Sequence, residues 1–128
     1  MKASRSPYQT LALMLALVPF AWLAGCKNEA SQQPPIPVEQ VPRVLSETFK
    51  DAKPGTMAAV QAIANSVQAG DPASLAQAHE LTSLSELSDE QRAAAFRVAA
   101  AIHQKMVENA ARGDQKAQEA LEHYRATK

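Results

Sequence analysis

The chain has 128 residues, of which 46% are hydrophobic, and this length allows one small domain and little more. Its 13 basic and 13 acidic side chains give a net charge of zero, so the basic excess of a nucleic-acid-binding surface is absent and no nucleic-acid partner is expected. A single cysteine excludes an intramolecular disulfide framework and a CxxC zinc or redox motif.

Residues 1–25 have the pattern of a secretory signal. Lys2 and Arg5 precede an apolar run, no acidic residue is present, and small residues follow. The run LALMLALVPFAWL has 13 residues and contains a proline, whereas a bilayer-spanning helix needs roughly 20 apolar residues. The segment is therefore short for a permanent membrane span. It leads into the motif formed by Leu23, Ala24, Gly25 and Cys26.

With this motif, residues 1–26 resemble a bacterial lipoprotein precursor, whose lipobox reads Leu, a small residue, Gly or Ala, then Cys. The resemblance implies that the thiol of Cys26 receives a diacylglycerol and that the chain is cut after Gly25. It also implies that a further acyl chain can be added to the new amino terminus. Two or three acyl chains on one residue make release from the membrane negligible, since each buried methylene contributes about 0.8 kcal/mol. The alternatives are a leader with a chance cysteine and an uncleaved anchor.

The position after the lipidated cysteine influences sorting in this class of lipoprotein, and Asp there favours retention in the inner membrane. This chain has Lys27. The resemblance therefore implies the periplasmic face of the outer membrane, in an organism that has one.

Residues 26–42 are expected to form a disordered tether behind the lipidated cysteine. The stretch has no helical or strand period and is rich in proline, which favours an extended polyproline-II path. At ~3.1 Å per residue, residues 27–42 would reach roughly 50 Å. A proline-rich ligand for an aromatic groove is the alternative, but no repeated PxxP register is present.

Residues 43–128 are predicted to form an all-α domain, a small bundle or pair of helical hairpins with four to five helices. Apolar residues recur at spacings of three and four, and no sustained period of two is present. A first helix, with its apolar stripe over 41–52, is expected to end at Pro54 and Gly55. A second stripe over 57–67 stops at Gly70.

Three further helices have clear start signals. Asp71, followed by proline, is suited to cap the third helix. Ser88 and Gln91 form a capping-box pattern at the start of the fourth, which is expected to end at Gly113. Asp114 then begins a fifth.

The turns at 68–71 and 111–114 are similar in sequence. Each has a glycine that can adopt a left-handed conformation, followed by an aspartate. They weakly resemble the tight hairpins of tetratricopeptide-like repeats, but the aromatic and small-residue pattern of that repeat is absent. Chance use of a common turn explains them equally well, so we expect two hairpins and no solenoid.

Residues that could carry chemistry are sparse. His79, His103 and His123 lie on three different predicted helices and form no HxxxH or HExxH motif. No GxSxG, GxGxxG or P-loop is present. The sequence therefore predicts no enzymatic activity, no metal site and no cofactor.

The composition of the predicted domain suggests an interaction surface. Residues 43–128 contain 20 alanines but only three aromatic residues, so the core is expected to be lean and the domain modestly stable. A small bundle without a partner fits this composition. Alternatively, the fourth helix meets a protein partner or a second copy through apolar residues that spread over more than one face: Phe96, Val98, Ile102, Met106 and Val107.

Two functions remain open at this point. The first is a non-catalytic, lipid-anchored module of the cell envelope that holds a protein partner or supports an assembly. The second is a binding module for a small apolar or lipidic ligand between the helices.

Overall fold

The computed structural model describes residues 33–127, and the prediction of an all-α fold is confirmed there. The 3₁₀ turn η2 (Val38–Gln40) leads into the helices α1 (Val41–Thr48), α2 (Pro54–Gln68), α3 (Ala73–Thr82), α4 (Asp89–Ala111) and α5 (Gln115–Ala126). None of these helices is long and apolar enough to cross a membrane. The predicted signal segment, the lipobox and Lys27 lie outside the described residues.

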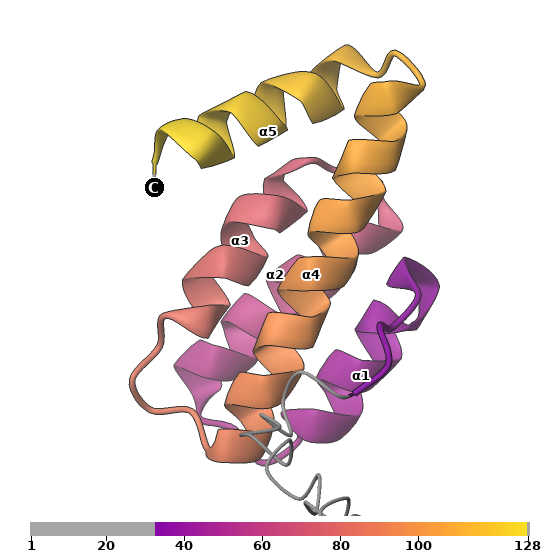
Figure 1. Ribbon diagram of the computed structural model, residues 1–128. Helices are drawn as coiled ribbons and strands as arrows, with labels where there is room; N and C mark the ends of the chain where they lie inside the picture. The colour runs from indigo at the N-terminus through magenta and orange to yellow at the C-terminus, as the bar shows by residue number, and fades with distance from the viewer. Residues whose placement is uncertain (1–32, 128) are drawn as a thin grey trace, which may run out of the picture. The chain divides into compact units, whose positions relative to one another are not determined.

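Helices α1 to α4 form a closed ring in which each helix contacts the next and α4 contacts α1 (Figure 1). Short connections and alternating directions make this an up-and-down four-helix bundle. Helix α5 lies outside the ring and packs chiefly on α4 and also on α3. It crosses the end of the bundle where α4 finishes (Figure 1).

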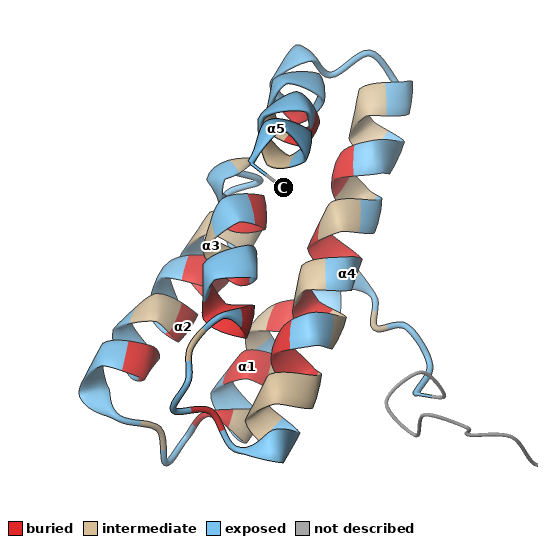
Figure 2. Ribbon diagram, turned by 60° about the vertical axis from the view of Figure 1, so that its left-hand side comes forward, coloured by how far each residue is buried: buried red, intermediate tan, exposed pale blue. Residues whose placement is uncertain are grey.

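The core lies between the inward faces of the ring helices (Figure 2). Its largest fully buried side chains include Phe49, Leu45 and Ile63. Ala78 on α3 and Ala95 on α4 are also fully buried. Because alanine has so little side chain, these positions let helix backbones approach closely, which is how an alanine-rich sequence fills a core with few aromatic residues.

The prediction of a disordered tether over residues 26–42 is wrong for its described part. A guanidinium nitrogen of Arg97 on α4 donates a 3.1 Å hydrogen bond to the carbonyl oxygen of Pro34. Ile36 and Val38 are partly buried against the core. These two apolar side chains explain the difference, because burying them stabilises an extended segment that proline alone would leave free.

The predicted domain boundary at residue 43 moves accordingly. Val41 is fully buried and begins α1, with Pro42 in the first turn, where its missing N–H costs nothing. The compact unit runs from Pro34 to the end of the chain.

Pro54 and Gly55 do not end the first helix, as the sequence suggested; they begin the second. Helix α1 already stops at Thr48, and Phe49 caps it while filling the core. Proline favours the first helical turn because its fixed φ matches the helix. The apolar spacing that extends to Ala52 therefore covers a short connection as well as the helix.

The two similar turns have the same backbone geometry. Gly70 and Gly113 have φ values of +66° and +93°. In each turn the N–H of the following aspartate donates to the carbonyl five residues earlier, and the N–H of the glycine to the carbonyl three residues earlier, at 2.8–3.1 Å. Asp71 and Asp114 then accept hydrogen bonds from backbone N–H groups of Ala73 and Ala117. Each turn therefore ends one helix and begins the next.

The capping box at the start of α4 is confirmed. The hydroxyl of Ser88 accepts from the N–H of Gln91 at 3.2 Å, and the side chain of Gln91 accepts from the N–H of Ser88 at 3.1 Å. Asp89 and Glu90 lie in the first turn, where negative charge suits the helix dipole.

Candidate functional site

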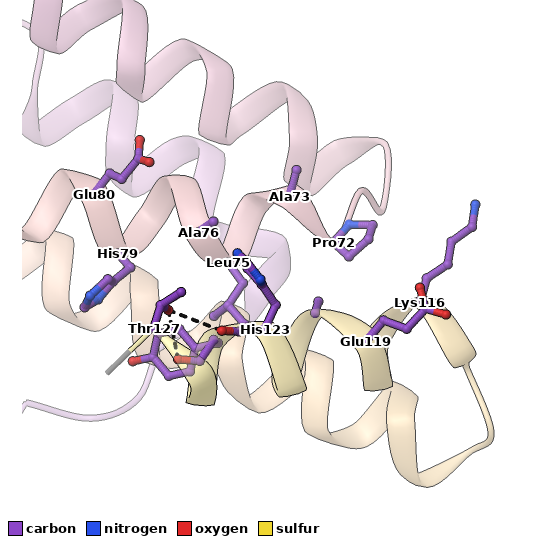
Figure 3. Close-up of a pocket in the computed structure, with 12 residues that line it drawn as sticks. Pro72, Ala73, Leu75, Ala76, His79, Glu80, Lys116, Glu119, His123 and Thr127 are labelled. Carbon is purple, nitrogen blue, oxygen red and sulfur yellow. Dashed lines mark hydrogen bonds between the residues drawn. The ribbon is translucent and has the colours of Figure 1, made fainter.

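A groove with a volume of about 560 Å³ lies between α3 and α5 (Figure 3). The two helices run in the same direction along it, so Pro72 and Lys116 lie at one end while His79 and Thr127 lie at the other. Side chains from both helices line it: Pro72, Ala73, Leu75, Ala76, His79, Glu80, Lys116, Glu119, Ala120, His123, Tyr124 and Thr127.

Small and apolar side chains form the surface between the two helices. Ala73 and Ala76 belong to α3 and Ala120 to α5, and each leaves room between the helix backbones. Leu75 is buried beneath them and ties α3 to the core. A groove of this kind can accept an apolar surface without a large rearrangement of its walls.

A cluster of three rings from three helices lies at one end of the groove. The ring of Tyr124 on α5 lies 5.4 Å from that of His79 on α3, edge to face at 88°. It also lies 5.7 Å from the ring of His103 on α4. Both separations fall within the range of favourable aromatic contacts, so Tyr124 fastens α5 to the two helices on which it rests.

Charged side chains lie among the groove residues but carry both signs. Glu80 belongs to α3, while Lys116 and Glu119 belong to α5. Glu80 and Glu119 are both exposed, as is Lys116. The groove therefore combines an apolar floor with polar margins that can pair with either sign of charge.

The predicted interaction face of α4 is not one surface. Val98, Ile102 and Met106 are buried in the core, whereas Phe96 is 57% exposed and Val107 is 44% exposed. Helix geometry explains the division, because Phe96 and Val107 are two and nine positions from Val98, about 200° and 180° around the helix. Of the five residues, three hold the bundle together and two point away from it.

Two of the three histidines, His79 and His103, share a neighbour that the sequence did not reveal. Tyr124 lies on α5 and is partly buried against the core. Its contacts with His79 and His103 depend on the turn at Gly113, which folds α5 back onto α3 and α4. No spacing along the chain could have indicated this cluster, since its members are 21 or more residues apart.

Within residues 33–127, no group of three or more His, Cys, Asp or Glu side chains is arranged to hold a metal ion. The one side chain there with a clearly shifted pKa is Glu86, which belongs to the loop between α3 and α4 and not to the groove.

Comparisons with protein families, with curated proteins and with solved structures find no match to this chain.

Proposed function

We propose that this chain is a lipid-anchored, non-catalytic binding module of the bacterial cell envelope, and that the groove between α3 and α5 receives a helix of a partner protein. The lipobox from Leu23 to Cys26 supports the anchor. The apolar groove, with its small side chains and polar margins, is the observation that carries the binding role.

A helix suits this groove for three reasons. The α5 wall extends from Lys116 to Thr127, which is about 16 Å or three helical turns. The alanines on both walls permit close approach of a third backbone. Glu80 and Lys116, on opposite walls, can pair with charges that flank the apolar face of an amphipathic helix.

The short tether places this binding event close to the membrane. Because the compact unit begins at Pro34, only residues 27–33 separate it from Cys26. These seven residues can span at most about 25 Å, and they are fewer than half of the sixteen in a tether that ended at residue 42. Lys27 supports the periplasmic face of the outer membrane as the location.

A small apolar or lipidic ligand is the second candidate occupant. The groove volume of about 560 Å³ supports it, because small-molecule sites in proteins usually enclose about 300–1,000 Å³ and have mainly apolar walls.

Site-specific photocrosslinking in the lipidated protein tests the binding role. A photoreactive residue at Ala76 or Ala120 is expected to form an adduct with a helical segment of one envelope protein, mapped by mass spectrometry. The same residue at Ala58, exposed on α2, is expected to form none. Ala76→Arg should abolish the adduct from position 120, whereas Ala58→Arg should leave it unchanged. Adducts with a lipid or small molecule in place of a protein would support the second candidate, and an absence of any groove-specific adduct would reject both.

The anchor is tested separately by metabolic labelling with a palmitate analogue. Incorporation is expected in the wild-type chain and should be lost in Cys26→Ser. Label that persists in the variant would show that Cys26 is not the lipidated residue.

A further inference from the structure

A second apolar surface lies on the outward side of α4. Phe96 is the most exposed large hydrophobic side chain of the described residues, and Val107 is the next. They are eleven residues apart on the same face of the helix, about three turns or 16 Å. Ala100, between them, is also exposed. This face lies opposite the core side of α4. His103, between Ala100 and Val107, contacts Tyr124 of α5, so Phe96 lies at the end of the face that α5 leaves open.

The chain enters the domain directly beside this face. The hydrogen bond from Arg97 to the carbonyl of Pro34 fixes the entering segment to α4 at the residue next to Phe96. Seven residues, 27–33, lie between Pro34 and Cys26. Because seven residues can span at most about 25 Å, a bilayer that held acyl chains on Cys26 would lie within roughly that distance of Pro34.

Charged groups near Phe96 fit a phospholipid surface. Arg92 and Arg97 flank Phe96 on its two sides of the helix, and both are partly exposed. Nη1 of Arg92 donates to the carbonyl oxygen of Thr82 at 3.4 Å and Nη2 of Arg97 to that of Pro34, and Nε of Arg97 is buried. The guanidinium N–H groups that these bonds leave over can each donate to a phosphate oxygen. Asp89 and Glu90 follow at the helix start, so the surface is of mixed charge and suits lipids that are largely zwitterionic.

We propose that the outward face of α4 centred on Phe96 rests on the phospholipid surface in which Cys26 is anchored. The inference rests on the lipid anchor of the proposed function. The aromatic ring lies at the level of the lipid headgroups, with the remaining N–H groups of Arg92 and Arg97 toward the phosphates, as amphipathic helices bind at an interface. Helix α4 thereby fixes the orientation of the domain relative to the membrane, which the tether alone would leave free.

Tryptophan fluorescence of the lipidated protein tests this arrangement. The only tryptophan, Trp22, lies in the segment removed with the signal, so Phe96→Trp introduces a single reporter into the mature chain. The matched control is Met57→Trp. Met57 is 36% exposed on α2, and the main neighbours of α2 in the ring are α1 and α3. Both proteins are reconstituted in vesicles of phosphatidylethanolamine and phosphatidylglycerol, with and without brominated acyl chains.

The proposal predicts blue-shifted emission and bromine quenching for the reporter at position 96, and water-like, unquenched emission at position 57. Equal, water-like emission at both positions would overturn it. Blue-shifted emission at position 96 that bromine does not quench and that grows with protein density would also overturn it, by placing a second copy on this face. Intact mass of the same samples shows whether Cys26 carries its acyl chains, so failure of the anchor is distinguished from failure of the docking.

Discussion

The hydroxyl of Thr56 donates a 2.6 Å hydrogen bond to Oε1 of Glu86, which joins the first turn of α2 to the loop between α3 and α4. Nζ of Lys53 lies 3.0 Å from the other carboxylate oxygen of Glu86. Thr56 is only 3% exposed, whereas the carboxylate remains open to solvent. The connection between α1 and α2 and the loop between α3 and α4 are thus joined at the end of the bundle away from α5 (Figure 1).

This contact predicts a specific dependence of stability on pH. The hydrogen bond from Thr56, followed by the hydrogen bond and charge of Lys53, lowers the pKa of Glu86 below its usual value of 4.5. A carboxyl whose pKa is lower in the folded state stabilises the fold above its unfolded pKa, and this contribution is lost as pH falls through the folded pKa.

Glu86→Gln is therefore expected to lower the free energy of unfolding at neutral pH. The difference from wild type should shrink as the pH falls below 4.5, as measured by urea denaturation over a pH series. Glu122→Gln, at an exposed position of α5, is the control and should have little effect at any pH. A difference that stays constant across the acidic range would contradict the role given to the Glu86 carboxylate.

The two phenylalanines of the helical domain should respond very differently to truncation. Phe49 is fully buried, so Phe49→Ala should cost about 3–5 kcal/mol of unfolding free energy through lost burial and a residual cavity. Phe96→Ala at its exposed position should change stability by less than about 0.5 kcal/mol. Chemical denaturation of the soluble chain without its signal and Cys26 measures both. A similar cost at the two sites would show that Phe96 is part of the core.

The glycines of the two similar turns should be intolerant of a side chain. An added Cβ at Gly70 or Gly113 meets no neighbouring atom, so the penalty comes only from the positive φ. Each Gly→Ala substitution should cost about 1–2 kcal/mol. Gly55→Ala is the matched control, because Gly55 lies in the first turn of α2 without positive φ. It should be stabilising by about 0.5–1 kcal/mol. Thermal denaturation of the three variants gives the comparison.

The segment before residue 43 should contribute to folding. A soluble fragment that starts at residue 43 lacks Val41, whose complete burial alone is worth about 1.5–3 kcal/mol. It also lacks Ile36 and Val38. The fragment should unfold at lower denaturant concentration than one that starts at residue 33. Equal midpoints would show that residues 33–42 act only as a linker.

Local signals in the sequence predicted the helix ends well. The capping box at Ser88 and the turns at Gly70 and Gly113 depend only on neighbouring residues. Each requires one local backbone conformation and a nearby side chain that accepts a backbone hydrogen bond. The same logic failed at Pro54, where proline suits both the end of one helix and the start of the next. The resemblance to tetratricopeptide-like hairpins is limited to the two turns at Gly70 and Gly113.

Features that depend on how helices cross could not be predicted in this way. The apolar residues of α4 cover most of its circumference, so the sequence could not tell that Val98 faces the core while Phe96 faces away. The bond from Thr56 to Glu86 joins residues 30 positions apart. The groove itself requires α5 to lie beside α3, which is decided by the angle of the turn at Gly113.

The position of α5 outside the closed ring has a mechanical consequence. The groove has one wall on a ring helix and the other on α5, which rests on the ring through Ala117, Leu121 and Tyr124, so its width is decided by how α5 packs there. The contacts among α1 to α4 can therefore stay unchanged while a tilt of α5 adapts the groove to occupants of different width. Changes in the connection at residues 112–114 would be expected to tune affinity without altering any residue that touches the occupant.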